Sequence, residues 1–140
     1  MSNTISISGL EITIDNPNQI LNMGGPWIGN IYTGNDLISQ DCIIDNFLYQ
    51  EDTNLLFFVK YHLVTQGKGI FKTSNWYFTI NFYNVTAKTV CQFEKIFDMI
   101  HLGEFKSPTE LIVYPAFHDA FKNKQQIFNI DDEDFYVVKN

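Results

Sequence analysis

The stretch of sequence that decides the fold is Trp76-Tyr77-Phe78-Thr79-Ile80-Asn81-Phe82-Tyr83. Its even positions carry Trp, Phe, Ile and Phe, whereas its odd positions carry Tyr, Thr, Asn and Tyr. Side chains alternate between the two faces of a β-strand, so this period of two predicts a strand. Large hydrophobic residues recur with this spacing from Asn54 to Met99, without a run of helical spacing. We therefore expect a mainly β domain.

The segment before this stretch, Leu55 to Leu63, predicts the centre of the sheet. Its odd positions are all apolar, and its even positions turn polar only at Lys60 and His62. A strand with one apolar face and a second face that is half apolar fits between two neighbours in a sheet. The polar segments 50–54 and 66–69 on either side predict hairpin-like turns, so we expect an antiparallel meander.

The other apolar runs also have the length and spacing of strands. They cover residues 5–14, 27–33, 37–44, 42–49, 111–114, 126–130 and 135–138. We expect the first of them to be bent or bulged at Gly9 and to end before Asp15. Residues 107–110 spell a helix-capping box, but the β-branched and aromatic run that follows favours a strand. The predicted fold is a mainly β antiparallel meander that forms a curved sheet, a sandwich or a barrel.

One short helix is expected in the C-terminal third, between Pro115 and Asn123. Proline suits the first position of a helix. Apolar residues with helical spacing follow it and form one stripe: Ala116, Phe117, Ala120 and Phe121.

Length and composition indicate one domain with an acidic surface. The chain has 140 residues, of which 45% are hydrophobic, enough for a single globular domain over residues 1–140. It has 9 lysines, no arginine and 16 acidic residues, giving a net charge of −7 with histidine neutral. Such a surface repels nucleic acid and anionic lipid, and the guanidinium group that often recognises phosphate and guanine is missing. It attracts basic partners.

The cysteines and the N-terminus favour a reducing compartment. Cys42 and Cys91 lie in separate strand-like runs, without a C-x-x-C pair or a nearby pair of histidines. We expect both to be reduced core thiols, with a disulfide between neighbouring strands as the alternative.

Residues Met1 to Thr4 lack the basic and apolar regions of a secretory signal, and no apolar run has membrane-spanning length. We expect a cytoplasmic protein, provided that no signal peptide was removed.

No motif in the sequence assigns a catalytic, metal or cofactor site. None of the three histidines has a second His or Cys at ligand spacing. A metal or acid–base cluster would require the convergence of Asp98, His101, Glu104, His118 and Asp119. A G-x-S-x-G elbow and a phosphate loop are both missing from the sequence. We therefore expect a protein that is not an enzyme and that carries neither cofactor nor metal.

One short motif resembles a known family. Gly25-Pro26-Trp27, together with Gly29, is similar to the G-x-W-x-G opening of lipocalin-like and nitrobindin-like barrels. The resemblance implies a barrel that encloses one small ligand, with Trp27 packed low in the first strand against the barrel floor. Those barrels also use an arginine beside the tryptophan or the ligand, which this chain lacks. A small-ligand-binding barrel is the alternative function, and an enzyme of unknown chemistry ranks third.

Acidic residues gather in two parts of the sequence and carry the preferred functional prediction. An acidic surface captures a basic protein by electrostatic steering, with aromatic side chains as anchors. Bacterial immunity proteins, which silence a cognate toxin in the cytoplasm, are similar in being small, acidic and non-catalytic. We expect a protein-binding module, most concretely an immunity-like inhibitor of a basic toxin or enzyme. The candidate partner-binding residues are Asp36, Asp41, Asp45, Glu51, Asp52, Asp131, Asp132, Glu133 and Asp134.

Overall fold

Two antiparallel β-sheets make up the described part of the chain. The computed structural model describes residues 3–20, 25–67, 69–71, 73–115 and 124–139. The larger sheet contains β1 (Asn3–Ile7), β2 (Leu10–Gln19), β3 (Trp27–Thr33), β4 (Asp36–Gln50), β5 (Leu55–Gln66), β6 (Thr73–Asn84), β7 (Thr89–Phe97) and β11 (Phe135–Lys139). The smaller sheet contains β8 (His101–Ser107), β9 (Glu110–Tyr114) and β10 (Gln126–Asn129). A short 3-10 turn, η1 (Gly69–Phe71), lies between β5 and β6.

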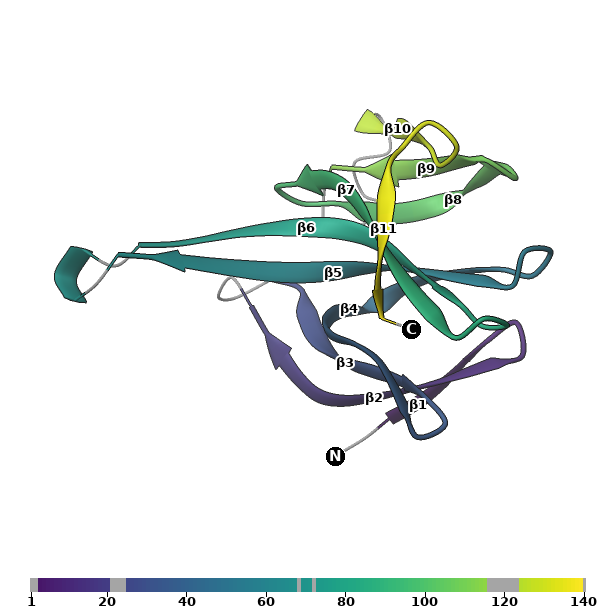
Figure 1. Ribbon diagram of the computed structural model, residues 1–140, viewed down its shortest axis with the longest axis horizontal. Helices are drawn as coiled ribbons and strands as arrows, with labels where there is room; N and C mark the ends of the chain where they lie inside the picture. Colours follow the sequence, from purple (N-terminus) through teal and green to yellow (C-terminus); the bar gives the residue numbers. More distant parts are fainter. Residues whose placement is uncertain (1–2, 21–24, 68, 72, 116–123, 140) are drawn as a thin grey trace.

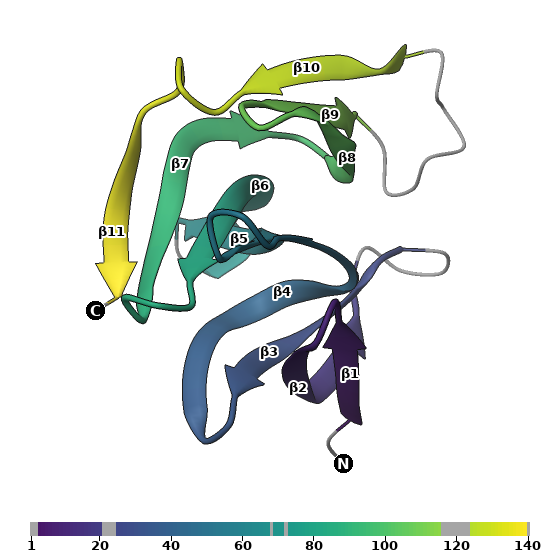
Figure 2. The ribbon, with the colours of Figure 1, turned by 90° about the vertical axis from the view of Figure 1, so that its right-hand side faces the viewer.

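The order of the strands confirms the predicted antiparallel meander. The larger sheet runs β1-β2-β3-β4-β5-β6-β7-β11, and the smaller sheet runs β10-β9-β8 (Figures 1 and 2). β5 lies between β4 and β6, as expected for a central strand. Figure 2 shows that the larger sheet is strongly bent, with β1 to β4 below β5 and β6 and the smaller sheet above them. Among the described residues, the larger sheet ends at β1 and β11, so it forms an open curved sheet.

The central strand separates two hydrophobic cores. Leu56, Phe57, Phe58 and Val59 of β5 are all fully buried, because both faces of the strand are covered. Phe57 and Val59 belong to the inter-sheet core, which lies between the larger and the smaller sheet. This core includes Phe78, Phe93, Leu111 and Phe128, together with Ile28 of β3 and Ile43 of β4. Leu56 and Phe58 belong to the intra-sheet core, which joins the two arms of the bent sheet and includes Ile12, Ile14, Ile31, Tyr83 and Val90.

The bend of the larger sheet is built into β4. Cys42 of β4 lies opposite Lys60 of β5, but the next matched pair is Phe47 with Phe58. Residues 43–46 of β4 therefore face the single β5 residue between those two pairs. Extra residues in one strand bend it away from its partner. As a result, β4 pairs with β3 in the lower arm and with β5 in the upper arm.

The sequence-based strand boundaries were wrong at several places. Ser8 and Gly9 have positive φ and form a hairpin turn between β1 and β2, instead of a bulge in one strand. β2 continues through Asp15 to Gln19, and β7 ends at Phe97, short of Met99. The strand predicted at residues 111–114 is confirmed as β9. The helix predicted between Pro115 and Asn123 lies outside the described residues, apart from Pro115 itself.

Candidate functional site

Three neighbouring turns bring part of the predicted acidic surface together. Glu51 and Asp52 lie in the β4–β5 turn, and Asp131 and Asp132 lie in the β10–β11 turn, all four exposed. The β8–β9 turn joins these two turns. Its Pro108 carbonyl accepts a hydrogen bond of 3.0 Å from the Gln50 amide, and its Thr109 carbonyl accepts one of 2.9 Å from the backbone of Ile130. We call Glu51, Asp52, Asp131 and Asp132 the acidic turns.

The other predicted acidic residues have different surroundings. Glu133 is half-buried and forms an ion pair of 3.8 Å with Lys95, while the backbone carbonyl of Asp134 accepts a hydrogen bond from Glu94. Asp36 begins β4, at the end of the strand opposite to Glu51. The remaining two lie along the same strand: Asp41, with a left-handed φ of 57°, and the exposed Asp45. The acidic turns therefore contain four of the nine candidate residues, and those on β4 are spread along it.

Trp27 does not occupy the position that the barrel resemblance implies. It is the first residue of β3, and 48% of its surface is exposed. In an open sheet there is no barrel floor for its ring to pack against. Gly29, the other motif residue, is packed so closely that an added Cβ would lie 2.8 Å from the Asp15 carbonyl oxygen. The motif therefore supports the close approach of β2 and β3.

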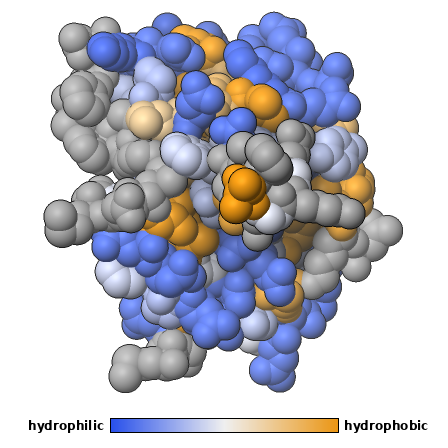
Figure 3. Space-filling model, turned by 90° about the vertical axis from the view of Figure 1, so that its left-hand side faces the viewer, coloured by the Kyte–Doolittle hydropathy of each residue, from blue (hydrophilic) through white to orange (hydrophobic). Residues whose placement is uncertain are grey.

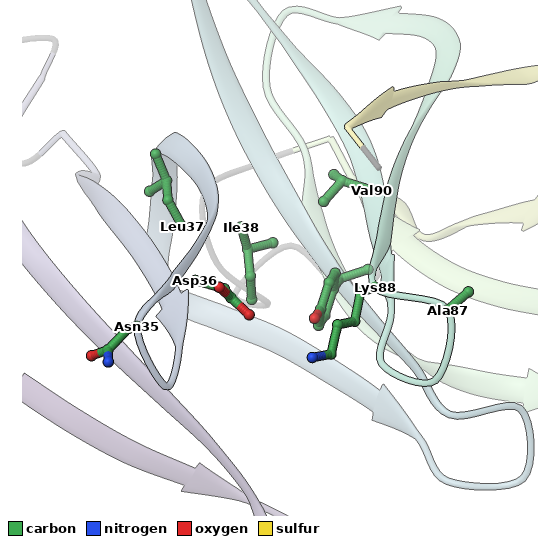
Figure 4. Close-up of a pocket in the computed structure, with 8 residues that line it drawn as sticks. Asn35, Asp36, Leu37, Ile38, Ala87, Lys88 and Val90 are labelled. Carbon is green, nitrogen blue, oxygen red and sulfur yellow. The ribbon is translucent and has the colours of Figure 1, made fainter.

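An open cleft lies between the β3–β4 hairpin and the β6–β7 turn. Its first cavity, of about 420 Å³, is lined by Asn35, Asp36, Leu37, Ile38, Tyr83, Ala87, Lys88 and Val90. Figure 4 shows the side chains of Asp36 and Lys88 pointing toward one another from the two sides. Its second cavity, of about 400 Å³, is lined by Leu37, Ile38, Ser39, Gln40, Lys60, Gln92 and Val138. Leu37 and Ile38 line both cavities, so the two adjoin along the start of β4, and we refer to them together as the cleft.

A chain of polar side chains, which we call the polar ladder, crosses the sheet beside this cleft. His62 Nε2 lies 2.8 Å from Thr79 Oγ1, whose hydroxyl lies 2.7 Å from Asn81 Oδ1. The Asn81 amide donates to Gln92 Oε1 at 3.3 Å, and the Gln92 amide donates to the Tyr136 hydroxyl at 2.7 Å. Thr79, Asn81 and Gln92 are buried. The ladder therefore satisfies polar groups that would otherwise destabilise the middle of the sheet.

The ladder fixes the protonation of His62. Because the Thr79 hydroxyl donates its single proton to Asn81, it must accept a hydrogen bond from His62, whose Nε2 therefore carries the proton. Burial and, to a lesser extent, the nearby charge of Lys60 lower the pKa of His62 from 6.5 to about 4, while Asp41 opposes the shift. The imidazole also stacks on Tyr77, with ring centroids 4.5 Å apart. His62 is thus a neutral, oriented donor at neutral pH.

Sequence reasoning missed the polar ladder. The alternating pattern identifies Thr79 and Asn81 only as the polar half of a strand. Their burial could have been inferred from their place beside the predicted central strand. In the structure, Thr79 pairs with Lys60 and Asn81 with Phe58 of that strand. Polar side chains at the centre of a sheet are buried, and buried polar groups need hydrogen-bond partners.

The two thiols are confirmed as free and buried. Cys42 belongs to the intra-sheet core and Cys91 to the inter-sheet core, so the sheet itself separates them. Burial raises the pKa of Cys42 to about 12, and burial also raises the pKa of Cys91. Both thiols therefore stay protonated at neutral pH, and protonated thiols are poor nucleophiles.

Among the described residues, no group of three or more His, Cys, Asp or Glu side chains is placed to hold a metal ion. His118 and Asp119, from the cluster considered above, lie outside those residues. No described helix combines the length and the apolar character that crossing a membrane requires.

The β5–β6 hairpin carries a second group of exposed side chains. It projects beyond the other strands of the larger sheet, at the end opposite to the β4–β5 turn (Figure 1). Leu63 and Trp76 pair across this hairpin and continue the apolar face of Tyr61 and Phe78 beyond the core. Ile70 near the tip is 93% exposed. Figure 3, which views this end, shows apolar patches among hydrophilic ones.

Comparison with protein-family models, with curated proteins and with solved structures found no match to this chain. Its proposed function therefore depends on the arrangement of its own residues.

Proposed function

We propose that this chain is a non-enzymatic protein-binding module that captures a basic partner at the acidic turns. The observation that carries the proposal is the pair of hydrogen bonds that attach the β4–β5 and β10–β11 turns to the same β8–β9 turn. They hold Glu51, Asp52, Asp131 and Asp132 in one exposed region. Carboxylates gathered in this way attract a cationic surface and raise the rate of association.

An aromatic side chain beside these turns supports the same proposal. Phe135 follows the β10–β11 turn directly and is 51% exposed. Its ring is held by edge contacts to Phe82 at 5.2 Å and to Phe93 at 5.6 Å between ring centroids. A rigid, half-exposed aromatic side chain loses little entropy on binding, which suits an anchor residue. The acidic turns would then steer the partner, and Phe135 would contribute contact area.

The more specific proposal is an immunity-like inhibitor that neutralises a basic toxin or enzyme. The small acidic chain and the aromatic side chain next to its acidic turns support this class, in which the inhibitor covers its target and does no chemistry. Inhibitors of this kind are encoded beside their targets. The first partner to test is therefore a basic protein encoded next to this chain.

The experiment compares two charge variants with equal net charge. The test variant replaces the acidic turns as E51Q, D52N, D131N and D132N. The control variant is E11Q, E94Q, D98N and E104Q, which removes four exposed charges outside the candidate partner-binding residues. At low salt we expect the association rate constant of the test variant with the basic partner to fall about tenfold, and to depend much less on salt concentration than that of the unmodified protein. The control variant should show a smaller decrease in both. Equal slowing in both variants, or none in either, would contradict a role for these turns.

A further inference from the structure

The second cavity of the cleft has a surface suited to a small molecule. Its volume of about 400 Å³ falls in the range of ligand pockets. Leu37, Ile38 and Val138 supply apolar contacts, and Lys60 and Gln92 supply hydrogen-bond donors. None of the described residues that line this cavity carries a carboxylate. The lining therefore combines an apolar wall with a cationic group.

Lys60 can donate to a bound group. Its Nζ donates hydrogen bonds to the Gln40 carbonyl oxygen at 2.5 Å and to Ser39 Oγ at 3.4 Å. An ammonium group has three donors, so these two contacts hold the group in place and leave one proton for a ligand. An ammonium held by neutral oxygens keeps its full positive charge beside the cavity. It would favour an anionic ligand over a neutral or cationic one.

The polar ladder orients the second donor. Gln92 is buried, and its Oε1 accepts from Asn81, which fixes the orientation of the amide. Its Nε2 donates one proton to Tyr136, and an amide nitrogen has a second proton. Gln92 of β7 and Lys60 of β5 both line this cavity, so the two side chains border the same space. A carboxylate, with two acceptor oxygens, can engage both.

We infer that this cleft binds a small amphipathic carboxylate, with its head group at Lys60 and Gln92 and its apolar body along Leu37, Ile38 and Val138. The first cavity shares Leu37 and Ile38 and adds Val90 and Tyr83, which gives a longer apolar body room to extend. Two carboxylates act against binding. Asp36 lines the first cavity, where the side chain of Lys88 faces it. The carboxylate of Asp41 is close enough to influence His62, but it lines a different cavity, next to Gln40. This site is separate from the acidic turns.

The experiment titrates the whole chain with three probes that share one tail: octanoate, octanol and octylammonium. Calorimetry at constant pH and salt should show saturable octanoate binding, octanol binding weaker by about tenfold, and no octylammonium binding. Lys60→Met keeps the aliphatic stem and removes the charge, so octanoate should bind about tenfold more weakly, as expected for one charge-assisted hydrogen bond. The matched control is Lys95→Met, which removes an exposed lysine on β7 and should leave octanoate affinity unchanged.

A second variant, for which octanoate affinity is expected to rise instead of fall, keeps the test decisive if Lys60→Met fails to fold. Asp41→Asn removes the opposing carboxylate from an exposed position, so octanoate should bind more tightly, with octanol unaffected. Three results would each overturn the inference: no saturable octanoate binding, octylammonium binding as tight as octanoate, or an octanoate affinity that is unchanged in every one of these two variants that folds.

Discussion

The polar ladder shows how single residues can carry hydrogen bonding across a hydrophobic sheet. Thr79 and Asn81 are fully buried on β6, yet each has a partner on the same face of the sheet. Every donor in the ladder points the same way, from His62 toward Tyr136. An unpartnered polar group at such a site would cost about 1–3 kcal/mol. The hydrogen bonds of the ladder are therefore needed to keep this part of the sheet stable.

The pH dependence of stability should reveal the state of His62. Burial and Lys60 lower its pKa from 6.5 to about 4, so the unfolded chain binds more protons than the folded chain between these values. Stability contributed by neutral His62 is complete above the unfolded value and is lost as the pH falls toward 4. His62→Gln should flatten this part of the curve, measured as the urea midpoint across the window. His101→Gln is the control, and an unchanged slope in the His62 variant would contradict the prediction.

Some residue environments could be predicted from the sequence, and others could not. The burial of Cys42 and Cys91 was predictable, since each lies in an apolar run, but the sequence left a disulfide between neighbouring strands open as the alternative. The reason why they cannot pair was not predictable, because it depends on which face of the sheet each side chain occupies. The environment of Gln92 depends on β11, a strand more than 40 residues away along the chain. Local periodicity contains no information about that contact.

Among the elements, β4 determines the shape of the molecule. Asn46 stabilises the bend of this strand. The Asn46 amide donates to the Leu102 carbonyl at 3.0 Å, and its Oδ1 accepts from the Leu102 backbone N–H at 2.8 Å. One side chain thus satisfies both backbone groups of a β8 residue, as a neighbouring strand would. This contact links the larger sheet to the smaller sheet at the point where β4 leaves its register with β5.

Replacing Asn46 should therefore weaken the contact between the sheets. Asn46→Ala leaves the buried N–H and C=O of Leu102 without partners, so we expect a loss of about 3 kcal/mol in the free energy of unfolding, measured with urea. Gln50→Ala, which removes an exposed side-chain hydrogen bond from the same strand, should cost less than about 1 kcal/mol. Equal losses in the two variants would mean that the Asn46 contact has no special role.

Element types were more predictable than element geometry. The central position of β5 followed from its apolar residues on both faces, and the strand at β9 followed from its β-branched residues. The extra residues in β4 gave no such signal, because Ile43 and Ile44 continue an ordinary apolar run. The positive φ of Ser8 and Gly9 made a hairpin where a bulge was predicted. Both differences arise from pairing registers, which a single strand does not encode.

At the scale of the whole molecule, the two cores depend on one strand. Phe57 and Phe58 are consecutive and fully buried, but Phe57 packs in the inter-sheet core and Phe58 in the intra-sheet core. The backbone that places one ring also places the other. A strand shared in this way couples the smaller sheet to the distant arm of the larger one. We therefore expect one cooperative unit, although the two cores share no face.

Hydrogen exchange can test this coupling with two matched variants. Phe57→Leu and Phe58→Leu each remove aromatic contacts from one core and should cost about 1–2 kcal/mol. The slowest amides of β9 report on the inter-sheet core, through Leu111 and Val113, and those of β2 report on the intra-sheet core, through Ile12 and Ile14. Because such amides exchange through global unfolding, each variant should lower protection equally in both strands. If Phe57→Leu lowered protection only in β9, and Phe58→Leu only in β2, the cores would unfold independently and the shared strand would not couple them.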